Sequence, residues 1–264
     1  MKNTPLVSIV INCYNGEKFL KKCFQSVLNQ SYKNWEIIFW DNKSTDQSAK
    51  IAKSFKDKRI KYFKSNKFEK LYRTRNLAIK KSKGKYICFL DTDDLWNKNK
   101  LSSQINLIKK KNYKIIYTNF LVKNENTKKS YLPYKKEILP KGYITQNLLD
   151  NYCIGIVTIM IDRKIFQQNK FNERYDIIGD FDLFLKLSKK HEISAIQRPL
   201  ATFRVHNKNF SSRNLGLYLE ELNFWLKKNR FKLYSGFNLR QIKINILKLR
   251  TKKIIKVFWR PGNI

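Results

Sequence analysis

Short apolar runs and amphipathic stretches alternate along most of this chain. Runs of strand length lie at Val7–Ile11, Trp35–Trp40, Ile60–Phe63, Tyr86–Leu90, Lys114–Val122, Ile154–Asp162 and Ala201–Val205. A helical stripe follows the first run and contains Phe19, Leu20, Cys23, Phe24, Val27 and Leu28. Further helices are predicted over Leu71–Lys81, Leu101–Ile108 and Asp180–Lys189, and from Ser44, which forms a capping box with Gln47. This alternation predicts βαβ units and a doubly wound, mostly parallel α/β sheet.

Three carboxylates follow the strand Tyr86–Leu90, namely Asp91, Asp93 and Asp94. Ligands of open α/β sheets bind at the carboxyl ends of strands, so chemistry is expected here. In an extended segment Asp91 and Asp93 point the same way, and their charges repel unless a cation lies between them. Mg²⁺ and Mn²⁺ prefer oxygen donors and share them with substrate phosphates. The cluster indicates either a divalent metal site for a phosphorylated ligand or a helix N-terminus capped by Asp94.

The chain divides by composition near residue 212. Before it, the polar segment Asn124–Lys141 with its two prolines predicts a loop or lid within one catalytic domain, residues 1–212. After it, Arg213–Ile264 contains 13 Lys/Arg and two Asp/Glu, and predicts a basic helical extension. Its apolar residues are Phe224, Trp225, Phe231, Tyr234, Ile242, Ile246, Leu249, Ile254, Ile255, Phe258 and Trp259. Such helices either lie on a membrane surface or pack on the domain.

The composition limits the classes of binding partner and the cellular compartment that we expect for this protein. The 264 residues are 42% hydrophobic, enough for a core, and carry a net charge of +36, which favours polyanions such as nucleotides, nucleic acid or an anionic membrane. Four scattered cysteines indicate neither a disulfide framework nor a zinc site. The sequence shows no signal-peptide pattern and no apolar run of membrane-spanning length. We therefore expect a protein on the cytoplasmic side of the cell membrane.

Five segments, in order, resemble the family 2 glycosyltransferases of the GT-A fold over roughly residues 6–212. They are VSIVINCYN (7–15), SVLNQSYKNWEIIFWDNKSTD (26–46), TRNLAIKKSKGKYICFLDTDD (74–94), IIGDFDLFLKL (177–187) and PLATFRVH (199–206). The third resembles the segment that leads to the family's DXD motif, and the fourth the segment with its catalytic base. The resemblance implies transfer of a sugar from a nucleotide diphosphate to an acceptor hydroxyl, with inversion.

The resemblance also implies roles for individual residues. Asp180 is expected to be the general base, and Asp91 and Asp93 the ligands of Mn²⁺ or Mg²⁺. His206, at the end of the last strand, is expected to be a third metal ligand, with a phosphate donor or a plain structural histidine as the alternatives. The residues expected at the nucleotide sugar are Cys13, Tyr14, Asn15, Glu17, Asp41, Asn42, Arg75 and Thr92. Asn42 stands where the family often has a second aspartate that helps to read uracil, and an amide can also bind a base. Asp182, at i+2 from Asp180, is expected to face elsewhere.

We expect a UDP-sugar as donor, a glycan or lipid-linked glycan as acceptor, and peripheral contact with an anionic membrane during surface-polysaccharide assembly. Three other interpretations fit the sequence less well. A nucleic-acid-binding protein would explain the charge but leaves the DXD without a role, so no nucleic acid is expected. In phosphatases of the haloacid dehalogenase type the DXD follows the first strand, whereas here it follows a later one. A catalytically dead relative would lack the acids that are intact here.

Overall fold

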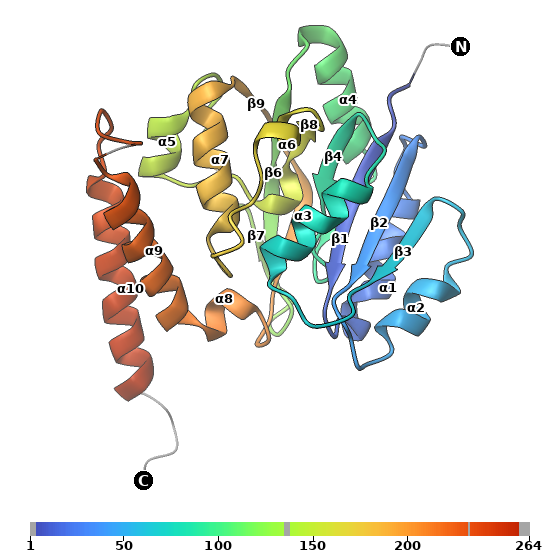
Figure 1. Cartoon of the computed structure of the whole chain (residues 1–264), viewed down its shortest axis with the longest axis horizontal. Helices are drawn as coiled ribbons and strands as arrows, with labels where there is room; N and C mark the ends of the chain where they lie inside the picture. Colours follow the sequence, from blue (N-terminus) through green and yellow to red (C-terminus); the bar gives the residue numbers. More distant parts are fainter. Residues whose placement is uncertain (1–3, 135–137, 232, 259–264) are drawn as a thin grey trace.

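The structure is a computed structural model, and it describes residues 4–134, 138–231 and 233–258, with side chains described as far as Thr251 (Figure 1). Within these residues one sheet of nine strands forms the centre of the fold. The strands are β1 (Val7–Cys13), β2 (Trp35–Asp41), β3 (Ile60–Lys64), β4 (Tyr86–Phe89), β5 (Leu95–Trp96), β6 (Ile115–Asn124), β7 (Ser130–Tyr131), β8 (Met160–Asp162) and β9 (Ile193–Val205).

The sheet is parallel at one end and mixed at the other. Its order is β3-β2-β1-β4-β8-β6-β9-β5, with β7 paired to β6. The first four strands are parallel, as the apolar runs predict, and all seven residues of both β1 and β2 are buried. Beyond β4 the sheet is mixed, because β8 runs antiparallel to both β4 and β6. Parallel pairing returns only between β6 and β9.

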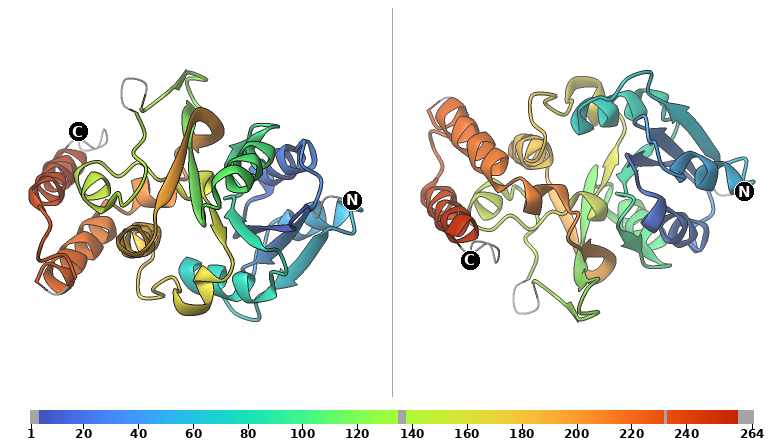
Figure 2. Two further views of the ribbon diagram at one scale, coloured as in Figure 1. Left: turned by 90° about the horizontal axis from the view of Figure 1, so that it is seen from above. Right: turned by 90° about the horizontal axis from the view of Figure 1, so that it is seen from below.

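Helices cover both faces of the sheet. They are α1 (Glu17–Leu28), α2 (Ser48–Ser54), α3 (Leu71–Lys81), α4 (Lys100–Lys111), α5 (Thr145–Asp150), α6 (Ile165–Gln168), α7 (Gly179–Lys190), α8 (Phe210–Arg213), α9 (Leu215–Asn229) and α10 (Arg240–Phe258). Figure 2 shows α1 and α4 on one face and α3 and α6 on the other. The carboxyl ends of β1, β2 and β4 therefore share one open edge, where the predicted acids lie.

Three local predictions need correction. The run Ile154–Asp162 is not one strand: a 3-10 turn at Ile156–Thr158 comes first, because the Thr158 amide and hydroxyl both donate to the carbonyl of Gly155. Ser44 does not cap α2, which starts at Ser48; its hydroxyl accepts the N–H of Asn15 instead. The last strand begins at Ile193 and not at Ala201, since a bulge opposite β6 accommodates Pro199.

The C-terminal extension packs on the domain over its described length. Figure 1 shows α9 and α10 side by side next to α5 and α7. Trp225, Tyr234, Ile242 and Ile246 are buried there, which is the packed-appendage alternative of the sequence analysis. The predicted apolar positions at 254, 255, 258 and 259 lie outside the described side chains. None of the helices in the described residues is both long and apolar enough to cross a membrane.

A buried lysine in α4 is expected to cost stability at neutral pH. The Lys100 ammonium lies 4.1 Å from the centre of the Trp96 ring and donates to Gln104 Oε1 at 2.9 Å, and burial lowers its pKa from 10.5 to about 8. Unfolding at pH 7 restores the ordinary pKa, so the charged lysine destabilises the folded state by about 3 kcal/mol. The unfolded state binds more protons between pH 8 and 10.5, and wild-type stability gains from this group there as pH rises.

We therefore expect Lys100→Met to raise the free energy of unfolding by about 2 kcal/mol at pH 7. Removing the buried charge gains about 3 kcal/mol, and about 1 kcal/mol is lost because Gln104 loses its hydrogen-bond donor. The gain should vanish at pH 10.5. Urea denaturation of both proteins at the two pH values measures it, and the exposed Lys98→Met is the matched control. An equal gain at both pH values would contradict the assignment to the lysine charge.

Candidate functional site

Two loops at the carboxyl edge hold each other through residues predicted to bind the nucleotide. Asp41, at the end of β2, is buried and accepts the Tyr62 hydroxyl at 2.6 Å. Asn15 Oδ1 accepts the Thr45 N–H at 2.9 Å, in the left-handed conformation (φ 51°) that asparagine tolerates. Glu17 Oε2 likewise accepts the N–H of residue 47 at 2.9 Å. These carboxylates and this amide therefore shape the loops around the edge.

Cys13 and Thr92 meet at the start of α1. A side chain at Gly16 would place its Cβ 2.9 Å from Cys13 Sγ and 3.1 Å from Thr92 Oγ1, so glycine is required for this close approach. Cys13 is buried, and desolvation raises the pKa of its thiol. Its sulfur accepts the Ser44 hydroxyl of the neighbouring loop at 3.9 Å, and it otherwise packs as a small apolar residue.

An exposed aromatic pair marks the side of the edge near β1. The rings of Tyr14 and Phe68 are 54% and 58% exposed, and their centroids lie 4.7 Å apart in an edge-to-face arrangement. Asn42 positions the Phe68 loop, because its amide donates to the Glu69 carbonyl at 2.7 Å and accepts the Glu69 N–H at 3.0 Å. Asn42 is buried, so its described hydrogen bonds hold this loop, while Tyr14 and Phe68 offer ring faces to solvent.

The three acids after β4 have three different environments. Asp91 Oδ1 accepts Arg75 Nη2 at 2.7 Å. Asp94 is buried and accepts the backbone N–H of Arg204 at 2.8 Å, and desolvation raises its pKa well above the ordinary value. It is not the cap of α4, which begins at Lys100 after the short strand β5. Asp93 is the partly exposed member, and its Oδ2 lies 3.1 Å from the imidazole of His206.

His206 is held against Asp93 from two sides. Its Nδ1 accepts the Lys208 N–H at 3.1 Å, which leaves Nε2 to carry the proton of the neutral ring and donate it to Asp93. Asn209 Nδ2 also donates to Asp93 Oδ2 at 3.3 Å, and the Phe19 ring stacks on the imidazole at 4.6 Å. This arrangement favours His206 as a donor that orients Asp93, although its predicted role as a ligand stays a prediction.

The donor set at this edge fits a hard divalent cation that is shared with substrate phosphates. No cluster of three His, Cys, Asp or Glu side chains poised for a metal occurs among the described residues. Asp93 presents Oδ1, which takes part in none of the hydrogen bonds in the described part of the chain. Mg²⁺ typically binds through one or two carboxylates plus phosphate oxygens. Asp93, with Asp91 nearby in sequence, matches that pattern.

A buried arginine connects Asp91 to the predicted base. Arg75 is almost fully buried in α3, and besides its ion pair with Asp91 its guanidinium lies 5.3 Å from the centre of the Tyr72 ring. Tyr72 in turn donates its hydroxyl to Asp180 Oδ1 at 3.1 Å. Desolvation raises the pKa of Asp180 against the opposing charge of Arg75. Both carboxylates thus interact electrostatically with one guanidinium.

The two acids of α7 diverge, as their i, i+2 spacing predicts. Asp182 is buried, pairs with Lys186 at 2.6 Å and accepts the indole N–H of Trp225 at 3.1 Å. It lies on the side of α7 that faces the extension. Asp180 faces away from this contact, toward Tyr72.

The extension also holds the loop in front of the base. Glu221 of α9 is buried, and its carboxylate accepts the backbone N–H groups of residues 176, 177 and 178 at 2.6, 3.0 and 3.0 Å. These are charge-assisted hydrogen bonds to the turn that leads into Asp180. The sequence pattern did not predict this role for Glu221, nor the positions of Phe68, Tyr72, Arg204 and Asn209 at the site.

Comparison with known proteins assigns the chain to a family. The sequence profile described as Glycosyl transferase family 2 matches residues 8–170. WfgD of Escherichia coli, a UDP-Glc:α-D-GlcNAc-diphosphoundecaprenol β-1,3-glucosyltransferase, is 35% identical over 72% of this chain and 73% of its own length. TuaG of Bacillus subtilis, a putative teichuronic acid biosynthesis glycosyltransferase, is 31% identical over 79% and 82%. Several similar Rickettsia glycosyltransferases are longer, and the chain spans about a third of their length.

Solved structures share the fold. Staphylococcus aureus TarS (residues 1–349) with UDP superposes with a TM-score of 0.65 at 20% identity, covering 87% of this chain and 74% of that one. The mannosyltransferase PcManGT of Pyrobaculum calidifontis, with GDP-Man and Mn²⁺, gives 0.61 at 13% identity, covering 86% and 66%. The GT-A-type α/β fold predicted from the sequence is confirmed, and the chain belongs to glycosyl transferase family 2.

Proposed function

We propose that this protein transfers a sugar from a UDP-sugar to a hydroxyl of a lipid-linked glycan, with inversion at the anomeric carbon. The observation that carries the proposal is the charge network at the carboxyl edge: Arg75 pairs with Asp91 of the DXD segment and interacts electrostatically with the buried base candidate Asp180. A phosphate site and a base on either side of one sugar are what a single displacement needs.

The donor would bind with its nucleobase on the exposed pair Tyr14–Phe68 and its diphosphate toward Asp93. Uracil as the base is supported by WfgD, a UDP-Glc-dependent glucosyltransferase by name, and by the TarS complex with UDP. Asp41 and Asn42 hold the loops that frame the base. Arg75, whose positive charge is partly neutralised by Asp91, would interact with the negative charge of the diphosphate.

Asp93 and Asp91 would hold Mn²⁺ or Mg²⁺, which when bound supplies a Lewis acid for the leaving diphosphate. His206 and Asn209 orient Asp93 by donating to its Oδ2. On the other side of the sugar, Asp180 would accept the proton of the acceptor hydroxyl. Its burial disfavours the charged form, and this raises its basicity.

A lipid-linked acceptor would place the protein at the inner, cytoplasmic face of the membrane as a peripheral enzyme. The printed acceptor of WfgD, a GlcNAc-diphosphoundecaprenol, supports this class. The basic extension supports it too, since Phe231 and Leu247 remain exposed there among lysines and arginines. Cationic helices with exposed apolar side chains bind anionic lipid.

The proposal is tested by donor binding. Calorimetry with UDP-, dTDP- and GDP-sugars should show binding of a UDP-sugar that needs Mn²⁺ or Mg²⁺ and disappears with EDTA. Asp93→Ala should weaken that binding at least tenfold, because a carboxylate ligand is lost. Asp57→Asn, which alters a carboxylate paired with Arg59 outside the site, is the control. If no nucleotide sugar binds with either metal, the proposed function is wrong.

A further inference from the structure

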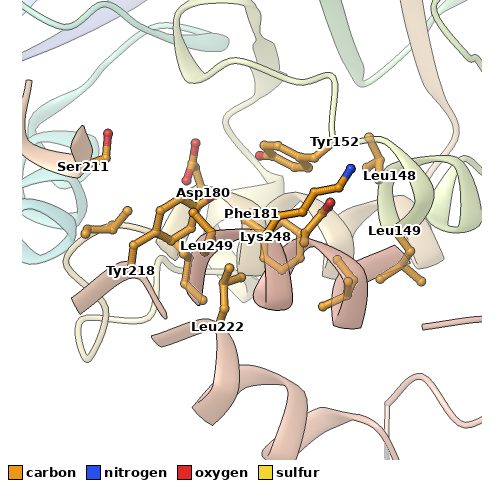
Figure 3. A pocket seen from close by; sticks show the side chains of 14 residues that line it. Leu148, Leu149, Tyr152, Asp180, Phe181, Ser211, Tyr218, Leu222, Lys248 and Leu249 are labelled. Atoms are coloured by element: carbon orange, nitrogen blue, oxygen red, sulfur yellow. The ribbon is translucent and has the colours of Figure 1, made fainter. Parts of the chain in front are cut away.

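A pocket of about 440 Å³ lies beside Asp180, between the domain and the extension (Figure 3). Its walls come from α5, from the start of α7, and from α9 and α10. Half of its lining residues are aliphatic, including Leu148, Leu149, Leu222 and Leu249. The volume falls within the range of small-molecule sites.

Six side chains with polar atoms interrupt this apolar lining, namely Tyr152, Asp180, Ser211, Tyr218, Asn245 and Lys248. Figure 3 shows the ends of Asp180, Tyr152 and Lys248 along one side of the pocket, with Leu222 and Leu149 on the other. The Tyr152 hydroxyl is buried and has no hydrogen-bond partner among the described residues. Buried polar groups in folded proteins are normally paired, so this hydroxyl points to a ligand that supplies the partner.

Lys248 gives the pocket a cation that the domain does not neutralise. It lies in α10, and no described carboxylate forms an ion pair with it; Asp180 is the one acid in the lining. A lysine ammonium binds phosphate as a point charge. The pocket therefore combines a base, a free hydroxyl, a cation and an aliphatic wall.

We propose that this pocket binds the acceptor, and that the acceptor is a sugar joined through phosphate or diphosphate to an aliphatic chain. This inference rests on the proposed function. The accepting hydroxyl would lie between Asp180 and Tyr152, the phosphate against Lys248, and the first part of the chain along the leucines. A sugar without a lipid phosphate would contact neither the leucines nor the Lys248 ammonium.

In the reaction, the acceptor oxygen forms a bond to the anomeric carbon as the bond from that carbon to the diphosphate breaks. The hydroxyl proton passes to Asp180, and the nucleoside diphosphate leaves with the bonding electrons. Tyr152 donates or accepts one hydrogen bond to orient the acceptor. Atoms and charge balance with no further reactant.

The helices that complete the pocket lie outside the segment that defines the family. The family profile ends at residue 170, whereas α9 and α10 begin at residues 215 and 240. Lys248 is therefore a feature of this chain's own C-terminal part. Acceptor choice is expected to reside there, while donor chemistry resides in the matched part.

The test is direct binding of a synthetic hexosamine diphosphate that carries a ten-carbon alkyl chain, measured by calorimetry without donor. Lys248→Met should weaken its binding ten- to hundredfold, as expected for a lost charge-assisted hydrogen bond. The same variant should bind the uncharged decyl glycoside of that sugar as the wild type does. Lys243→Met, an exposed lysine of α10 that does not line the pocket, should leave both affinities unchanged.

Tyr152→Phe supplies a second readout. A merely structural tyrosine would lose nothing, since its hydroxyl has no described partner, and the variant should unfold at the same or a higher urea concentration. We expect it nevertheless to bind both ligands at least fivefold more weakly. Unchanged affinity of both variants for the diphosphate ligand overturns the pocket assignment. That result is independent of nucleotide-sugar binding, which tests the proposed function by itself.

Discussion

Asp180→Asn is expected to lower kcat about a thousandfold while the affinity for the nucleotide sugar stays within about twofold of wild type. The amide fills the same space and still accepts the Tyr72 hydroxyl, but it cannot take a proton. The proposed donor site, at Asp93 and Tyr14, does not include this residue. Single-turnover kinetics together with calorimetry separate the two quantities. A variant that loses donor binding and turnover equally would place Asp180 in the binding site and not in proton transfer.

The pH dependence of the wild type follows from the same residue. Desolvation raises the Asp180 pKa above the ordinary aspartate value, against the opposing effect of Arg75, and Asp91 adds to the increase. A base works only when deprotonated, so kcat should fall as pH falls, with its midpoint above the range of an exposed aspartate. The residual activity of Asp180→Asn should lack this acidic limb. A wild-type kcat that stays flat to pH 4 would contradict the assignment.

Glu221→Gln is expected to lower the free energy of unfolding by about 2–4 kcal/mol and kcat by at least tenfold. Both oxygens of the native carboxylate accept backbone N–H groups, and the amide nitrogen of glutamine would instead face one of those donors. The loop that leads into Asp180 then loses its anchor. Urea denaturation and steady-state kinetics measure the two effects.

Glu220→Gln is the matched control, because Glu220 is the neighbouring acid on α9 but is exposed. We expect it to change neither stability nor kcat. A positioning role for Glu221 requires the fall in kcat to occur with an unchanged donor KM at a temperature where the variant is fully folded. If only stability falls, Glu221 supports the fold and not the alignment of the base.

The sequence pattern predicts those elements whose structure depends mainly on residues that are close together in the chain. The runs that form β1, β2 and β4 are buried on both faces, so continuous apolarity identifies them, and Asp91 and Asp93 follow the last of these strands directly. The prediction of one strand from Ile154 was wrong because an isoleucine-rich segment has the same apolar pattern in a 3-10 turn as in a strand. The antiparallel insertion of β8 depends on pairing partners that periodicity does not reveal.

The residues missed at the site act across long sequence separations. By its position in the sequence Tyr72 belongs to an apolar helix stripe, but its hydroxyl forms a hydrogen bond with Asp180, 108 positions away. Phe68 looks like an isolated aromatic in a polar loop until Asn42 fixes that loop beside Tyr14. Glu221 did carry a signal, because it is one of only two acids in a strongly basic segment. An acidic residue in such a segment is a candidate for a specific partner.

The contact between Glu221 and the loop of residues 176–178 has a consequence for how this protein could diversify. A helix that both borders the proposed acceptor pocket and anchors the loop before the proposed base cannot be exchanged as an independent module. A hybrid that takes its C-terminal helices from a relative with another acceptor would also receive a foreign anchor for its base. Changes of acceptor would therefore accumulate by point substitution within α9 and α10, with the Glu221 position held fixed, and recombination near residue 213 would yield inactive offspring.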